Sequence, residues 1–129
     1  MEQQKVNLAG VRKDFEVAYR FFSPEEGGRK MGPPSQLYRC DWAYDGDDIS
    51  ETGIYMIWPI FVDQSGEIIE PDTFVPIEGM AQMFIVNDNL RKAIHASRLM
   101  PGLRGYFMEG SSRVAEAVVT KLLAIASDF

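Results

Sequence analysis

The feature that most constrains the fold is a tight turn, Glu109-Gly110-Ser111-Ser112, between two stretches that could both be strands. Gly110 can adopt the positive φ that such a turn needs, and the two small serines do not crowd it. The second arm is ambiguous, because residues 113–126 are rich in helix-favouring Ala, Leu, Glu and Lys, whereas Val118-Val119-Thr120 favours a strand. The turn predicts a hairpin, and its pattern leaves the second arm open.

The stretch from Arg12 to Phe22 predicts a half-buried strand. Its apolar residues recur at every second position and share one face, while Asp14, Glu16 and Arg20 point the other way. A Gly- and Pro-rich loop over residues 25–35 follows, and loops of this length are often functional. Further strands are predicted over residues 37–44, 53–62, 67–70 and 80–86. In the second of these, Pro59 indicates a bulge or an edge position. Residues 89–95 predict one or two helical turns.

Composition predicts one ordinary domain over residues 11–125, preceded by a flexible segment, residues 1–10. The 129 residues are 46% apolar and carry a net charge of -6, which disfavours unspecific binding to nucleic acid or an anionic membrane. A single cysteine excludes an internal disulfide and fits a reducing compartment. The polar N-terminus has no apolar stretch behind it, so we expect a cytoplasmic protein that does not enter a membrane.

Few residues are candidates for chemistry. Cys40 could be a reactive thiol, although a lone cysteine is more often a small buried hydrophobe. His95 is the only histidine, and no nucleophile or acidic partner is identifiable beside it. Asp45, Asp47 and Asp48 lack the glutamate that a calcium-binding loop requires at its end. We therefore expect no catalytic residue, no cofactor and no bound metal.

Two sets of motifs, in order, carry a family resemblance. The first is the alternating strand from Phe15, then Ser23-Pro24-Glu25-Glu26-Gly27-Gly28-Arg29, then Tyr38-Arg39-Cys40-Asp41-Trp42. The second is His95, Pro101-Gly102-Leu103-Arg104, Glu109-Gly110 and Val118-Val119-Thr120-Lys121. Together they resemble the C-terminal β-barrel, the third domain, of bacterial elongation factor Tu over roughly residues 14–123.

The resemblance implies an all-β fold, a six-stranded antiparallel Greek-key barrel of the translation-factor type. In that family the segment after Glu-Gly is the last strand, so residues 113–123 become a strand. The family has no counterpart for residues 87–91, which leaves room for at most a short helical turn near residues 88–94. No Gly-x-x-x-x-Gly-Lys-Ser/Thr loop occurs, so no GTP binding is expected on this chain.

By motif match, Arg29, Arg39, Glu109 and Gly110 stand where that family gathers its contacts with aminoacyl-tRNA. Two departures weaken this role: Cys40 replaces the family's proline after Tyr-Arg, and Ser111-Ser112 replaces Gly-Arg after Glu-Gly. The alternative interpretation is that the two arginines are solvated or pair with Glu25, Glu26 or Asp41. The prominent aromatic residues are interpreted as core rather than as a base-stacking platform: Phe15, Tyr38, Trp42, Trp58, Phe84 and Phe107.

The resulting hypothesis is a non-catalytic binding module that engages a protein partner or forms a homo-oligomer. The alternative hypothesis is binding of tRNA or another structured RNA backbone through Arg29, Arg39 and Gly110.

Overall fold

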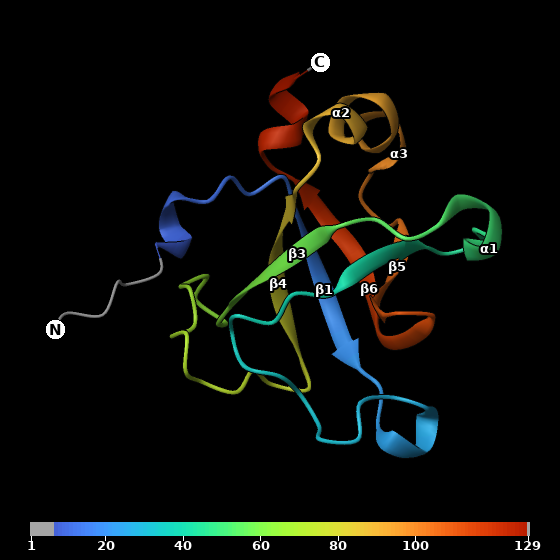
Figure 1. Cartoon of the computed structure of the whole chain (residues 1–129). Coiled ribbons are helices and arrows are strands. Elements are labelled where there is room, and N and C mark those ends of the chain that lie inside the picture. Colours follow the sequence, from blue (N-terminus) through green and yellow to red (C-terminus); the bar gives the residue numbers. More distant parts are fainter. Residues whose placement is uncertain (1–6, 129) are drawn as a thin grey trace, which may run out of the picture.

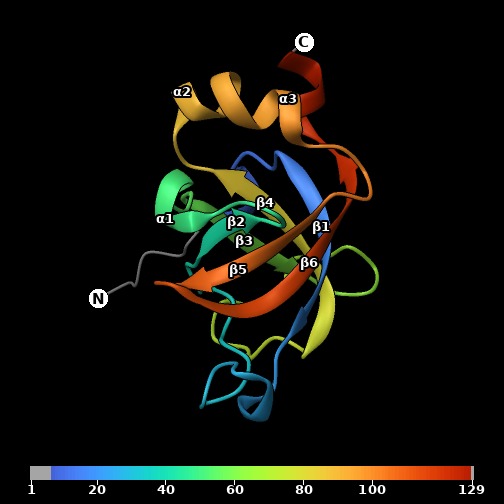
Figure 2. The ribbon, with the colours of Figure 1, turned by 90° about the vertical axis from the view of Figure 1, so that its right-hand side faces the viewer.

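The computed structural model describes residues 7–128, and its strands form one six-stranded antiparallel sheet with the order β2-β5-β6-β1-β4-β3. The sheet curls into a half-barrel (Figure 1, Figure 2). Its strands are β1 (Phe15–Phe21), β2 (Asp41–Tyr44), β3 (Ile57–Val62), β4 (Glu78–Ile85), β5 (Arg104–Glu109) and β6 (Ser112–Leu122). The helical elements are η1 (Leu8–Gly10), η2 (Pro24–Glu26), α1 (Ile49–Thr52), α2 (Asp88–Leu90), the π-helix η3 (Arg91–His95), α3 (Ala96–Arg98) and η4 (Ala124–Asp128).

The hairpin that the Gly110 turn predicts is confirmed as β5 and β6. Gly110 has a φ of 59°, and β6 pairs with β5 on one side and with β1 on the other. Pairing along both edges outweighs the helix propensity of this segment, because tertiary contacts override such weak local preferences. The inward-facing residues of β6 are small, and Ala115, Ala117 and Val119 are all buried.

The core lies on the concave side of the sheet. The strand over residues 12–22 is predicted to be half-buried, but Asp14 and Glu16 are buried too, where Asp14 pairs with Arg12 and Arg91 and Glu16 accepts from Thr120. The apolar face is as predicted, since Phe15, Val17, Tyr19 and Phe21 are all buried. They pack with the buried rings of Trp42, Phe61 and Phe107 in a chain of edge-to-face and stacked contacts. Gly105 makes room for this core, because a Cβ atom there would lie 2.2 Å from Cζ2 of Trp42.

The two outermost strands approach each other at one end of the half-barrel. Trp42 in β2 and Tyr55, two residues before β3, exchange both backbone hydrogen bonds, at 2.8 and 2.9 Å. The position of β3 confirms the edge interpretation of Pro59. The amide N–H of Phe61 points off the sheet onto the Gln36 side chain. Two residues earlier, Pro59 therefore stands where β4 requires no donor.

Three of the predicted strands are shorter in the structure than the sequence pattern indicates. In residues 37–44 only Asp41–Tyr44 forms a strand, because the preceding residues turn, with the Tyr38 amide donating to Ser35. In residues 53–62 the strand begins at Ile57, and Trp58 stays half-buried. In residues 67–70 there is a single bridge, between Val62 and Ile68.

The helical content around residue 90 was underestimated. Instead of a short turn, residues 88–98 form one continuous helical segment, called here the helical cap, which lies beside η4 at one end of the sheet (Figure 2). Two buried side chains anchor it: Nε of Arg91 lies 2.7 Å from Oδ1 of Asp14, and Nδ1 of His95 lies 2.6 Å from the Tyr44 hydroxyl. Local helix propensity cannot predict partners that lie this far away in the sequence.

The predicted flexible segment, residues 1–10, lies largely outside the described residues. Its last part forms η1, where the Asn7 side chain accepts a hydrogen bond from the Gly10 amide. The ammonium group of Lys13 donates to the carbonyls of Leu8 and Ala9, at 2.6 and 2.9 Å. This turn is therefore tied to the start of the domain.

Candidate functional site

The structure brings three of the four predicted contact residues together. Arg29, in the loop after β1, donates through Nη1 to Oε2 of Glu109 at 2.5 Å, and Glu109 precedes Gly110 in the β5–β6 turn. The Tyr38 hydroxyl donates to the same carboxylate oxygen, and the Arg29 guanidinium lies 4.9 Å from the centre of the Tyr38 ring. Arg29 also donates through Nε to the Gly32 carbonyl at 2.9 Å.

This cluster is internally satisfied. Arg29 pairs with Glu109 rather than with the acids that neighbour it in sequence. Burial, reinforced by the hydrogen bond to Glu109, raises the pKa of Tyr38, so its hydroxyl stays a donor at neutral pH. An anion at Arg29 would meet a charge that the Glu109 carboxylate already neutralises. The cluster therefore stabilises the loop more readily than it binds a phosphate.

Arg39 lies apart from Glu109 and faces an apolar groove. The groove runs over the convex side of β3 and β4 and has a volume of about 260 Å³. We call it the aromatic groove, and its lining includes Val11, Tyr38, Arg39, Trp58, Pro59, Ile60 and Phe84. Trp58 and Phe84 are directly opposite each other in the β3–β4 ladder, with ring centres 6.2 Å apart.

Gln36 holds the segment that places Arg39 over the groove. Its buried side-chain amide donates to the carbonyls of Phe61 and Ile69 and accepts from the Phe61 amide, each at 2.7 Å. The amide thus occupies the place of a neighbouring strand at the outer edge of β3. Three residues later, the exposed Arg39 guanidinium lies 4.2 Å from the centre of the Trp58 ring.

Two arginines lie over the aromatic pair, and they differ in their ionic and hydrogen-bonding partners. Arg12 lies 5.1 Å from the Phe84 ring, but it donates to Asp14 and to the Ile85 carbonyl and also lies 3.5 Å from Asp88. Arg39 makes neither an ion pair nor a hydrogen bond to any other residue between 7 and 128. Its guanidinium is therefore available to a ligand, and Arg12 is not.

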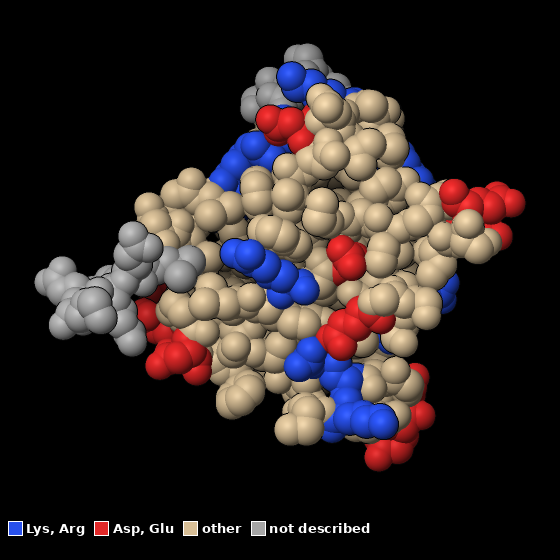
Figure 3. Space-filling model, viewed as in Figure 1, with Lys and Arg blue, Asp and Glu red and all other residues tan. Residues whose placement is uncertain are grey.

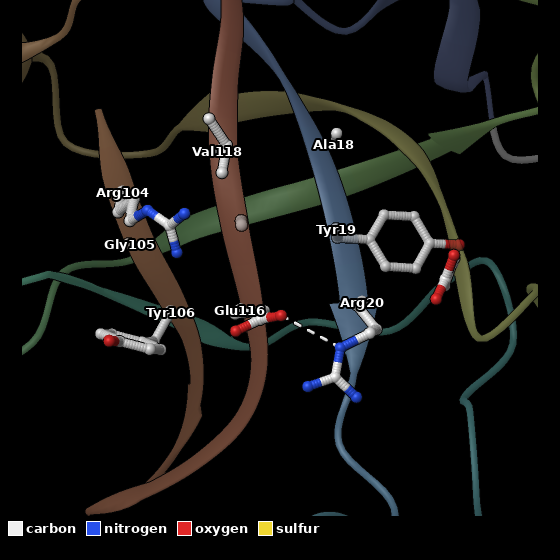
Figure 4. Close-up of a pocket in the computed structure, with 10 residues that line it drawn as sticks. Ala18, Tyr19, Arg20, Arg104, Gly105, Tyr106, Glu116 and Val118 are labelled. Carbon is white, nitrogen blue, oxygen red and sulfur yellow. Dashed lines mark hydrogen bonds and ion pairs between the residues drawn. The ribbon is translucent and has the colours of Figure 1, made fainter. Parts of the chain in front are cut away.

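A second groove, of about 270 Å³, crosses the outer faces of β1, β5 and β6 (Figure 4). Arg20 and Glu116 face each other in it, with Nε and Oε1 3.0 Å apart, and Arg20 also binds Glu26. Arg104 points into the same groove and has no ionic partner within the described part of the chain. Because paired charges line it, this groove offers less apolar contact than the aromatic groove.

His95 and Cys40 are both buried. Burial, with a smaller effect of nearby Arg98, lowers the pKa of His95 to about 4, and Asp14 only partly opposes this. Burial, with the charge of Asp41, raises the pKa of the Cys40 thiol. A neutral imidazole in contact with Tyr44 and a protonated buried thiol offer no activated nucleophile. Across residues 7–128, no group of three or more His, Cys, Asp or Glu side chains is arranged to hold a metal ion.

Sequence reasoning assigned all six prominent aromatic residues to the core. Phe15, Trp42 and Phe107 are buried as expected, whereas Tyr38, Trp58 and Phe84 are half-buried and line the aromatic groove. The useful signal was Pro59, which marked an edge strand. That Trp58 and Phe84 lie opposite each other depends on the β3–β4 register, which the sequence pattern does not specify.

Comparison with known proteins adds no family assignment: no protein-family model matches the sequence, and no curated protein is significantly similar to it. No helix within residues 7–128 is long and apolar enough to cross a membrane.

Proposed function

We propose that this chain is a non-catalytic binding module that holds a segment of a partner protein in the aromatic groove. The observation that carries the proposal is the combination of the half-buried Trp58–Phe84 pair, which lines the groove, with the Arg39 guanidinium, which has no ionic or hydrogen-bonding partner among residues 7–128. Tryptophan, tyrosine and arginine are the residues that most often dominate protein–protein binding energy. Tyr38 completes this combination at the groove wall.

The distribution of charge favours protein over RNA. Most arginines of the described chain are paired with acidic groups: Arg12, Arg20, Arg29, Arg91 and Arg98. On the face shown in Figure 3, basic and acidic side chains are interspersed on a largely uncharged surface. RNA binding depends on several cations acting together through counterion release, and such a surface supplies few.

The RNA alternative is supported by one observation. Trp58 with Arg39 above it could stack on a base, since aromatic and guanidinium planes both stack on nucleic acid bases. We also propose that the fold is related to the C-terminal barrel of elongation factor Tu and has its Greek-key connections. It is supported by the six antiparallel strands and by the contact between Arg29 and Glu109.

The first experiment separates the partner classes. A filter-binding titration with bulk tRNA at low and high salt compares the wild type with Arg39→Ala. We expect no salt-sensitive micromolar binding. Such binding, if it is lost in Arg39→Ala, would contradict the protein-binding proposal.

The second experiment tests the groove itself. A phage-displayed library of random peptides is selected on the wild type, on Trp58→Ala and on Phe74→Ala, which removes a 76%-exposed aromatic ring that does not line the groove. We expect peptides that bind the wild type and Phe74→Ala but not Trp58→Ala. Recovery of the same peptides on all three proteins would refute the groove as the binding site. Sedimentation analysis completes the test, because a dimer dissociated by Trp58→Ala would make a second copy the occupant.

A further inference from the structure

We propose that the segment bound in the aromatic groove carries a carboxylate beside its apolar side chains, and that Arg39 selects for that carboxylate. The inference rests on the proposed function, because it names the chemistry of the partner at the same groove. It makes Arg39 a specificity-determining residue and Trp58 the apolar anchor.

The Arg39 guanidinium lies over the Trp58 ring. A guanidinium stacked on a ring keeps its N–H donors at its edge, where a carboxylate can accept two of them side by side. Arg39 lies 4.2 Å from the centre of the Trp58 ring and donates to no other residue among those described. Stacking also reduces the number of conformations that the side chain must give up when it binds. The site is thus prepared for a planar anion.

The rest of the groove selects for apolar side chains. Trp58, Ile60 and Phe84 face the space, and Leu37 beside them is 43% exposed. The volume of about 260 Å³ lies just below the range of about 300–1,000 Å³ that is typical of small-molecule clefts. The groove therefore fits individual side chains of a peptide better than a large cofactor.

The edge of β3 makes backbone recognition by strand addition unfavourable. Pro59 supplies no N–H group at this edge, and the Gln36 side chain already occupies the Phe61 backbone amide and carbonyl. A bound segment must therefore be recognised mainly through its side chains. A carboxylate is the group that complements the one free charge of the described groove lining.

The test uses the random-peptide library on the intact protein, with Arg39→Gln and Arg104→Gln as a matched pair. Each variant removes one exposed guanidinium that lacks an ionic partner among residues 7–128, so the net charge changes equally. Only Arg39 lines the aromatic groove; Arg104 lies in the second groove (Figure 4). We expect peptides selected on the wild type and on Arg104→Gln to be enriched in Asp or Glu next to large apolar residues. Peptides selected on Arg39→Gln should keep the apolar residues and lose the acidic preference.

A binding titration then measures the pairing directly. The probe is one selected peptide and its amide variant, in which Asp becomes Asn or Glu becomes Gln. The amide variant should bind the wild type about three- to tenfold more weakly, and it should bind Arg39→Gln no more weakly than the acidic peptide does.

The outcomes separate the two proposals. Peptides that depend on Trp58 but show no acidic enrichment, or that keep it on Arg39→Gln, would overturn the carboxylate inference and leave the groove function standing. A library that gives no Trp58-dependent peptide would refute the proposed function and this inference with it.

Discussion

Mild acid should weaken the attachment of the helical cap, because His95 is buried in its neutral form. Its Nδ1 contacts the Tyr44 hydroxyl, the Arg98 guanidinium lies 3.9 Å from the centre of the Tyr44 ring, and the Tyr55 ring packs edge-on against the imidazole. Burial and the Arg98 charge both oppose protonation, which lowers the pKa from 6.5 to about 4, while Asp14 partly favours it. Between these two pH values the unfolded chain binds more protons than the folded chain. Stability therefore rises with pH in this window and is lost as the pH falls through it.

The magnitude follows from the two pKa values. A histidine with a pKa of 6.5 in the unfolded chain and about 4 in the folded chain lowers the free energy of unfolding by about 2.5 kcal/mol between pH 7.5 and 4.5. Solvent screening reduces this figure, so we expect a loss of about 1–2.5 kcal/mol. Carboxylates with a lowered pKa, such as Glu26 at about 2, begin to lose their stabilisation near their ordinary pKa of 4.5, at the acid end of the window, so the profile of the wild type must be compared with that of a variant without the histidine.

The assay is urea unfolding at several pH values between 4.5 and 7.5 for the wild type and His95→Gln. Glutamine can accept the Tyr44 hydrogen bond but does not titrate, and His95 is the only histidine, so the difference between the two profiles isolates this residue. The wild type should lose more stability than the variant on acidification. Parallel profiles would refute the claim that a buried neutral imidazole holds the cap.

Three further predictions concern the core and the loop cluster. Gly105→Ala should destabilise the protein by roughly 1–3 kcal/mol, seen as a lower Tm, because the new Cβ would overlap Trp42; an unchanged Tm would contradict that packing. Cys40 should resist dithiobis(2-nitrobenzoate) in the native protein and react with it in urea, since the thiol is buried and burial raises its pKa. Rapid reaction of the native protein would contradict this and would show that the thiol is accessible and reactive. Glu109→Gln should lower the free energy of unfolding by less than about 1 kcal/mol in urea titrations, because its ion pair with Arg29 is partly exposed, and a larger loss would make this cluster a main stabiliser of the loop.

The parts of the fold that local pattern specifies were predictable. The apolar face of β1 and the glycine at the β5–β6 turn depend on neighbouring residues, and both predictions are confirmed. The helical cap was underestimated, because its length depends on Arg91 and His95 reaching partners 77 and 51 residues away in sequence. Long-range partners of this kind decide the structure where local propensity is weak.

The same limit applies to the site, where two arginines that look equivalent in sequence differ in the folded protein. Arg29 follows a Gly-Gly pair in a loop that folds back to Glu109, so its charge is neutralised by a residue 80 positions away. Arg39 follows a segment that the hydrogen bonds of Gln36 fix to β3. In this position the Arg39 guanidinium lies over Trp58 and pairs with no acidic residue among those described. A ligand anion at Arg29 would be opposed by the charge of the neighbouring Glu109, whereas at Arg39 no acidic group among the described residues pairs with the guanidinium. If this chain recognises an anionic group through one of the predicted contact residues, Arg39 is therefore the residue to change first.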